Sequence, residues 1–186
     1  MKKIVVNDTN VFIDLFNVGL LKEFFSLPWE VHTTSFIMRE LQKEGQQEKV
    51  SVYKEKGLLH IPVLGPKDMT LIGNMFQEAI KKSNLSIADC SVWYYAKVNN
   101  YVLLTGDRKL RSTSACDGVE VHGMLYVFDC LVESGVITHK VAIEKLKLLY
   151  KTNIRLPKEE LDKRLKIWEA RIKDGGHVYA EENITE

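Results

Sequence analysis

Residues 85–111 read LSIADCSVWYYAKVNNYVLLTGDRKLR and place a carboxylate at each of two junctions between structural elements. Ser86, followed three residues later by Asp89, matches the capping pattern that begins a helix. The segment after it is apolar on almost every side, which is typical of a buried helix. Residues 101–104 then predict a short buried strand, followed directly by the turn that carries Asp107. In open parallel sheets, ligands bind at this carboxyl end of the strands.

Each of these two acids also has a purely structural interpretation. Asp89 could be only the second half of a capping box, which satisfies the first free backbone donors of its helix. Asp107 could be only the N-cap of the next helical turn. The pair by itself therefore does not establish a site.

Two further acids occupy similar places in the first part of the chain. Residues 3–6 predict a strand, and Asp8 follows it at the start of a helical pattern. Asp8 could cap that helix or belong to a site at the sheet edge. Glu40 is predicted to lie one to two turns into a helix that begins at Thr34 or Ser35 and, taken alone, reads as a solvated surface residue.

The rest of the chain alternates short apolar strands with helices. This alternation predicts an α/β fold, a three-layer domain with a parallel sheet and right-handed connections. The three-layer domain is expected over residues 1–137, and residues 138–186 are expected to form a helical C-terminal extension of the same compact unit. Further strands are predicted at residues 30–33, 58–63 and 119–121, and further helices at residues 66–80 and 124–132.

Composition excludes several classes of protein. The 186 residues are 45% hydrophobic and 27% charged, as in an ordinary soluble globular protein. No apolar run approaches the roughly 20 residues that cross a bilayer, so we expect a cytoplasmic protein without a membrane partner. The formal net charge is only +1, which means that any nucleic-acid binding must be local.

Cysteine and histidine give no metal-binding pattern. The three cysteines are odd in number and lack C-x-x-C spacing, so they are interpreted as reduced thiols. The histidines lack the i, i+4 spacing of a helical metal pair and are interpreted as structural. These histidines are His32, His60, His122, His139 and His177.

A parallel sheet would bring the four acids together. The carboxyl ends of its strands share one edge, so Asp8 and Asp107 should approach each other, and Glu40 and Asp89 could converge there. Two bare carboxylates about 4 Å apart repel by roughly 4 kcal/mol at an effective dielectric constant of 20. A divalent cation would neutralise them, and ligation by oxygen alone favours Mg²⁺ or Mn²⁺ over zinc. A pair of such ions about 4 Å apart can promote phosphodiester cleavage.

The ordered set of acids resembles the four motifs of PIN-domain nucleases. The motifs are DTN at residues 8–10, MREL at 38–41, SIAD at 86–89 and TGD at 105–107. The resemblance covers roughly residues 1–135, so the domain expected over residues 1–137 would be a PIN-like domain. It implies a metal-dependent endoribonuclease that acts on single-stranded RNA. It also implies the toxin half of a VapBC toxin–antitoxin pair, with an antitoxin protein as partner, and a homodimer.

The resemblance implies roles for individual residues. Asp8, Glu40, Asp89 and Asp107 would be the catalytic metal ligands. Thr105 would belong to the same catalytic set by orienting the Asp107 side of the site, and Asn10 would contribute contacts around the ligands. Some family members carry a further acid shortly after the last motif, where this chain has Lys109 and Leu110. The number of metal ions, one or two, therefore stays open.

Three basic residues beside Asp107 have more than one interpretation. Arg108, Lys109 and Arg111 could contact RNA phosphates, since Lys and Arg supply most such contacts. They could equally balance the acidic pocket or lie in solvent.

Two other functions are compatible with the same pattern. One is a catalytically weak PIN-like module that binds RNA or a protein. The other is a phosphoacceptor receiver domain, which shares the α/β layering. The receiver is disfavoured because Asp8 lacks an adjacent second acid, and because His122 and Gly123 follow the last strand where a lysine is expected.

Overall fold

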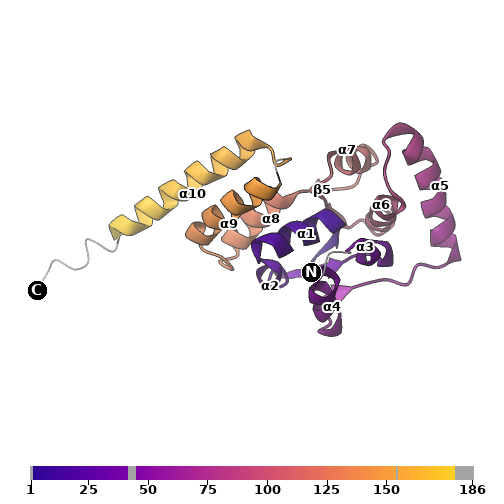
Figure 1. Ribbon diagram of the computed structural model, residues 1–186, viewed down its shortest axis with the longest axis horizontal. Coiled ribbons are helices and arrows are strands. Elements are labelled where there is room, and N and C mark those ends of the chain that lie inside the picture. Colours follow the sequence, from indigo (N-terminus) through magenta and orange to yellow (C-terminus); the bar gives the residue numbers. More distant parts are fainter. Residues whose placement is uncertain (1, 42–44, 154, 179–186) are drawn as a thin grey trace, which may run out of the picture. The chain divides into compact units, whose positions relative to one another are not determined.

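The structure is a computed structural model that describes residues 2–41, 45–153 and 155–178, with the side chains of residues 175–178 excepted. The order of its helices and strands is shown in Figure 1. Contacts within the chain group into two compact units, Met1–Met124 and Leu125–Glu186, and each is described by itself. Among the described residues, no helix is both long and apolar enough to cross a membrane.

The first unit is built on a five-stranded sheet in which all pairs are parallel. The strand order is β3-β2-β1-β4-β5. This confirms the predicted α/β fold with a parallel sheet. The strands are β1 (Lys3–Asn7), β2 (Trp29–His32), β3 (Leu59–His60), β4 (Val102–Leu104) and β5 (Val121–His122).

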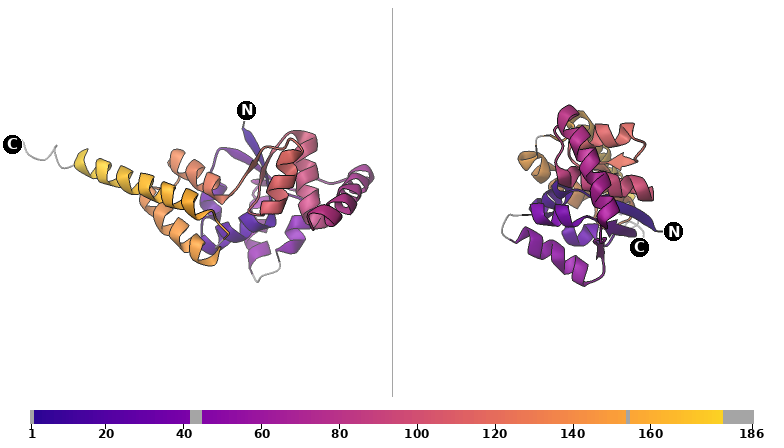
Figure 2. Two further views of the ribbon diagram at one scale, coloured as in Figure 1. Left: turned by 90° about the horizontal axis from the view of Figure 1, so that it is seen from above. Right: turned by 90° about the vertical axis from the view of Figure 1, so that its right-hand side faces the viewer.

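Helices cover this sheet. Helix α6 packs against β1 and β4, and α3, α5 and α7 pack in turn against α6 (Figure 2). Helix α1 contacts α2, α3 and α4. The helices are α1 (Thr9–Val18), α2 (Leu21–Phe24), α3 (Ser35–Glu40), α4 (Gln46–Glu55), α5 (Pro66–Lys82), α6 (Ile87–Asn99) and α7 (Arg108–Cys116).

The boundaries of α6 agree with the prediction from local sequence. Ser86 is the N-cap, and the Ser86 and Asp89 side chains form a reciprocal capping box. Asn100 ends the helix in the left-handed conformation with φ 56°, which asparagine tolerates better than most residues. Strand β4 follows at Val102, one residue later than predicted.

Two strands differ from their predicted ranges because of their partners. Strand β3 comprises only Leu59 and His60, since these residues pair with Val31 and His32 at the end of β2. Strand β5 comprises Val121 and His122 instead of residues 119–121. The amide of Val119 is engaged by the Ser114 carbonyl at 3.1 Å, in the turn that closes α7.

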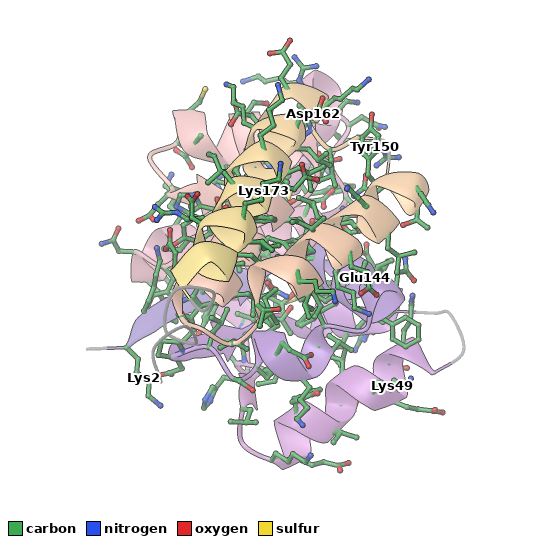
Figure 3. The ribbon with its side chains drawn as sticks, turned by 90° about the vertical axis from the view of Figure 1, so that its left-hand side faces the viewer. Lys2, Lys49, Glu144, Tyr150, Asp162 and Lys173 are labelled. Atoms are coloured by element: carbon green, nitrogen blue, oxygen red, sulfur yellow. The ribbon has the colours of Figure 1, made fainter. Side chains whose placement is uncertain are left out.

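The second unit is helical, as predicted for the C-terminal extension. It contains most of α8 (Met124–Glu133), together with α9 (His139–Thr152) and α10 (Lys158–Val178). Arg164 on α10 binds Asp129 on α8 through two nitrogens, with Nε–Oδ1 at 2.9 Å and Nη2–Oδ2 at 2.7 Å. Charged residues such as Glu144 on α9 and Lys173 on α10 lie exposed (Figure 3). The predicted boundary between a PIN-like domain over residues 1–137 and an extension over residues 138–186 stays a prediction.

Candidate metal centre

The strand order places a candidate site between β1 and β4. From β1 the chain continues to β2 on one side, and from β4 it continues to β5 on the other side. Strands β1 and β4 are adjacent, with β2 on one side and β5 on the other. Such a switch point is where open α/β sheets bind ligands, beyond the carboxyl ends of the strands. Asp8 follows β1 and Asp107 follows β4, and the Asp8 amide donates to the Leu104 carbonyl at 3.0 Å. The order also differs from the 2-1-3-4-5 order of receiver domains, which argues against that alternative.

Asp8 is the most enclosed of the acids, with 1% of its surface exposed. Its Oδ1 accepts from the Thr9 amide at 2.6 Å. Its Oδ2 accepts from Thr105 Oγ1 at 2.7 Å and from Asn10 Nδ2 at 3.2 Å. Burial, and to a lesser degree the charge of Asp89, raise the Asp8 pKa from 3.8 to about 7 in spite of these hydrogen bonds. Burial thus disfavours the charged form of Asp8, and a nearby positive charge would favour it.

Asp89 and Asp107 each commit one carboxylate oxygen to a helix start. Asp89 Oδ2 accepts from the Ser86 amide at 2.7 Å, and Asp107 Oδ1 accepts from the Leu110 amide at 2.8 Å. The Asp89 pKa is raised, mainly by burial and further by the charges of Glu40 and Asp107. Together with the effect of Asp89 on Asp8, this places Asp89 within electrostatic range of each of the other three acids.

Glu40 reaches this environment through a contact that the sequence did not indicate. It is the last residue of α3, one to two turns into the helix as predicted, and its Oε2 accepts from Thr9 Oγ1 at 2.6 Å. Helix α3 is tied to α6 by a 2.7 Å hydrogen bond between the buried hydroxyls of Thr34 and Ser91. The available signal for Thr9 was its position as a hydroxyl residue directly after Asp8.

The remaining carboxylate oxygens suit a hard cation. Within the described parts of the chain, Glu40 Oε1, Asp89 Oδ1 and Asp107 Oδ2 have no hydrogen-bond partner. Each of these side chains is thus anchored by one oxygen and can offer the other. An all-oxygen donor set with excess negative charge fits Mg²⁺ or Mn²⁺. The four acids could hold such an ion.

Arg111 points toward the site interior. Its Nη2 donates to the Thr105 carbonyl at 2.9 Å. A Cβ atom on residue 123 would collide with this guanidinium, so Gly123 provides the space for it. Burial lowers the Arg111 pKa, and the charge of Asp107 opposes that shift. Of the interpretations left open for this residue, the geometry favours balancing the acids over contact with RNA phosphate.

Thr105 joins two of the acids and supplies a test of the site. It is fully buried, donates to Asp8 and accepts the Asp107 amide at 3.0 Å. We expect Thr105→Val to weaken Mn²⁺ binding about 10- to 100-fold, because both ligands lose their orienting hydroxyl. Thr105→Ser, which keeps the hydroxyl, is the matched control. Isothermal titration with Mn²⁺ measures both, and equal affinities in the two variants would contradict the assigned role.

The fold is that of a parallel α/β protein in which two carboxylates, Asp8 and Asp107, follow the adjacent strands β1 and β4 at the switch point of the sheet. A protein-family profile described as a PIN domain matches residues 4–170. The chain therefore belongs to the PIN-domain family, whose members are generally nucleases.

The chain is similar to solved structures from two organisms. One is VapBC2 from Rickettsia felis bound to a DNA fragment from its promoter, with 18% identity, a TM-score of 0.47, and coverage of 64% of this chain and 98% of that chain. Another is PAE2754 from Pyrobaculum aerophilum, with 17% identity, a TM-score of 0.48, and coverage of 74% and 100%. No curated protein matches the chain in sequence.

Proposed function

We propose that the protein is a metal-dependent endoribonuclease that hydrolyses phosphodiester bonds in single-stranded RNA. The observation that carries this proposal is the electrostatic coupling of Asp89 to Asp8, Glu40 and Asp107, with the Asp8 pKa raised to about 7. Asp8, Glu40, Asp89 and Asp107 would hold Mg²⁺ or Mn²⁺. The test is cleavage of single-stranded RNA by the purified chain with Mn²⁺ and its loss on chelation.

The chain's own residues would position the reaction. When bound, the cation supplies an activated water and stabilises charge on the phosphate oxygens. Thr9, Ser86 and Thr105 hold one oxygen each of Glu40, Asp89 and Asp8, so the ligands are fixed before the cation arrives. Lys109 and Leu110 stand where some members carry a further acid after the last motif, so the number of cations, one or two, stays open.

The proposed path for RNA is a groove whose lining includes none of the four acids but does include Lys109, two residues after Asp107. It has a volume of about 910 Å³ and is lined by residues of α5, α6 and α7. Its lining includes four lysines, Lys81, Lys82, Lys97 and Lys109, and the aromatic ring of Trp93. Helix α6 carries Asp89 in its first turn, and Asp107 is the N-cap of α7, so the helices that line the groove also lead to the metal ligands. A groove in which lysines follow the phosphate backbone and an aromatic ring can stack on a base is typical of proteins that bind single-stranded nucleic acid.

The lysines at the end of α5 give a binding prediction. We expect Lys81→Ala with Lys82→Ala to weaken binding of a single-stranded RNA, because fewer phosphates are then neutralised by the protein. The slope of log affinity against log salt should become shallower by about 0.7 for each phosphate that the variant no longer neutralises. Fluorescence anisotropy at several salt concentrations measures both quantities.

Lys22→Ala with Lys49→Ala is the control double variant. These lysines line a separate pocket of about 280 Å³ beside Phe16 and Tyr53, and their loss should change neither quantity. RNA affinity that falls equally in the two double variants would remove the α5–α7 groove as the binding path.

The biological setting is also a proposal. The family resemblance suggests a toxin with an antitoxin partner, a homodimer and a cytoplasmic location. A small neighbouring gene for a DNA-binding antitoxin, whose product copurifies with this chain, would support the toxin assignment. Light scattering of the purified protein measures its oligomeric state.

A further inference from the structure

Three side chains that can ligate metals lie together outside the acidic site. Glu30, His32 and His60 each offer one ligand atom, and all three atoms lie within 4.8 Å of one another. Among the described residues, no other three Asp, Glu, His or Cys side chains bring their ligand atoms within 4.8 Å of one another, so the four acids of the candidate metal centre lie further apart than this group. The sequence did not reveal this cluster, because its histidines are 28 residues apart and meet only through the pairing of two strands.

Strand geometry brings the cluster together. His32 on β2 is directly opposite His60 on β3, and their rings stack with centroids 5.0 Å apart. Glu30 precedes His32 by two residues, so both side chains lie on the same face of the sheet. Glu30 Oε1 is 2.9 Å from His32 Nε2. One carboxylate and two imidazoles therefore converge from neighbouring backbones.

Tyr95 on α6 supports the buried member of the cluster. Its hydroxyl lies 2.9 Å from His32 Nδ1, while only 7% of His32 is exposed. A tyrosine hydroxyl can donate or accept. It can therefore donate to Nδ1 while Nε2 carries the proton shared with Glu30, or accept from Nδ1 when Nε2 binds a metal. A hydrogen bond to the second ring nitrogen is the usual support of a metal-bound histidine.

The other two side chains leave the cluster accessible. His60 is exposed and Glu30 is partly exposed, so an ion can approach from solvent. Within the described residues, neither ring nitrogen of His60 has a hydrogen-bond partner; its ring instead stacks on His32. Tyr95 also lies six residues beyond Asp89, roughly 9 Å further along α6 at 1.5 Å per residue. None of the four acids is among the charges that shift the pKa of Glu30 or His32, so the two groups are treated as separate sites.

We propose that Glu30, His32 and His60 bind Zn²⁺. Two imidazoles and one carboxylate form a three-ligand zinc set that leaves a fourth position for water. Imidazole nitrogen favours zinc, whereas the all-oxygen donors at the sheet edge favour Mg²⁺ or Mn²⁺. The two sites thus select different cations. Zinc would also tie β3, the two-residue strand at the sheet edge, to β2.

The test measures zinc binding by the full chain after metal removal with a chelator. Zn²⁺ titration against a competing chromophoric chelator should show one zinc that His60→Ala and Glu30→Gln each weaken by at least about 10-fold. Co²⁺ in place of zinc should give a visible absorption band that is lost in both variants. Excess Zn²⁺ should raise the melting temperature of the wild type and leave that of His60→Ala unchanged.

His122→Ala is the matched control. His122 is on β5, and its Nε2 lies 2.8 Å from Oε1 of Glu120, the residue before that strand. Among the described residues this histidine–glutamate pair belongs to no group of three close ligand atoms. This variant and Asp89→Asn should both keep the zinc affinity of the wild type. Equal zinc affinity in wild type, His60→Ala and Glu30→Gln would overturn the proposal, as would loss of the zinc in Asp89→Asn alone. Neither result depends on RNA cleavage.

Discussion

Asp8→Asn and Asp89→Asn are each expected to reduce Mn²⁺-stimulated cleavage of single-stranded RNA by at least about 1,000-fold, equivalent to about 4 kcal/mol of lost transition-state stabilisation. Asp8 is the buried centre of the cluster, held by Thr9 and Thr105. Asp89 is electrostatically coupled to the other three acids. Removing either charge would take away a proposed ligand and part of the negative potential that would attract the cation. Initial rates on a labelled RNA with Mn²⁺ or chelator measure the effect.

Asp68→Asn is the control for this comparison. Asp68 lies in the same unit and accepts from Tyr94 Oη at 2.7 Å and from the Gly65 amide at 2.8 Å. It is not among the acids that shift the pKa of Asp8 or Asp89. Its variant should cleave RNA at close to the wild-type rate. Identical residual cleavage by wild type and Asp8→Asn would reject the nuclease proposal. Tight, salt-dependent RNA binding without any metal-stimulated product would instead favour the binding module.

Local sequence was sufficient to predict the structure where both partners of an interaction are close in the chain. The Ser86 and Asp89 capping box spans four residues, and its side chains bond only to each other's backbone. The turn after β4 is equally local, since Thr105 accepts the amide of Asp107. Such signals correctly predicted where α6 begins and where β4 ends, and they placed two acids at element junctions.

Contacts between distant residues could not be predicted in the same way. Thr9 and Glu40 are 31 residues apart, and their 2.6 Å hydrogen bond depends on where α3 ends. His32 and His60 meet through the register of β2 and β3. Arg111 turns inward because Gly123, on another segment, leaves room for it. In each case the missing information was tertiary geometry, which periodicity and capping patterns do not encode.

The second large effect concerns the stability of the metal-free protein as a function of pH. The Asp8 pKa is about 7 in the folded chain and is expected near 3.8 when unfolded, because burial penalises the charged form. Between these values the folded state binds the additional proton, so the free energy of unfolding falls as pH rises. The stabilisation is fully present below pH 3.8 and is lost as pH passes through about 7. It amounts to about 4 kcal/mol in total, of which about 2 kcal/mol falls between pH 5 and 7.

Asp8→Asn isolates this contribution because asparagine does not titrate. Urea denaturation with a chelator should show that the free energy of unfolding falls by about 2 kcal/mol less in the variant than in wild type between pH 5 and 7. Saturating Mn²⁺ should stabilise wild type more at pH 7.5 than at pH 5, because the cation competes with the proton for the same carboxylates. Mn²⁺ should have little effect on the variant at either pH. If the free energy of unfolding falls equally with pH in wild type and variant, the Asp8 pKa is not raised in the folded chain. The proposal that a cation would offset the buried charge of Asp8 would then fail.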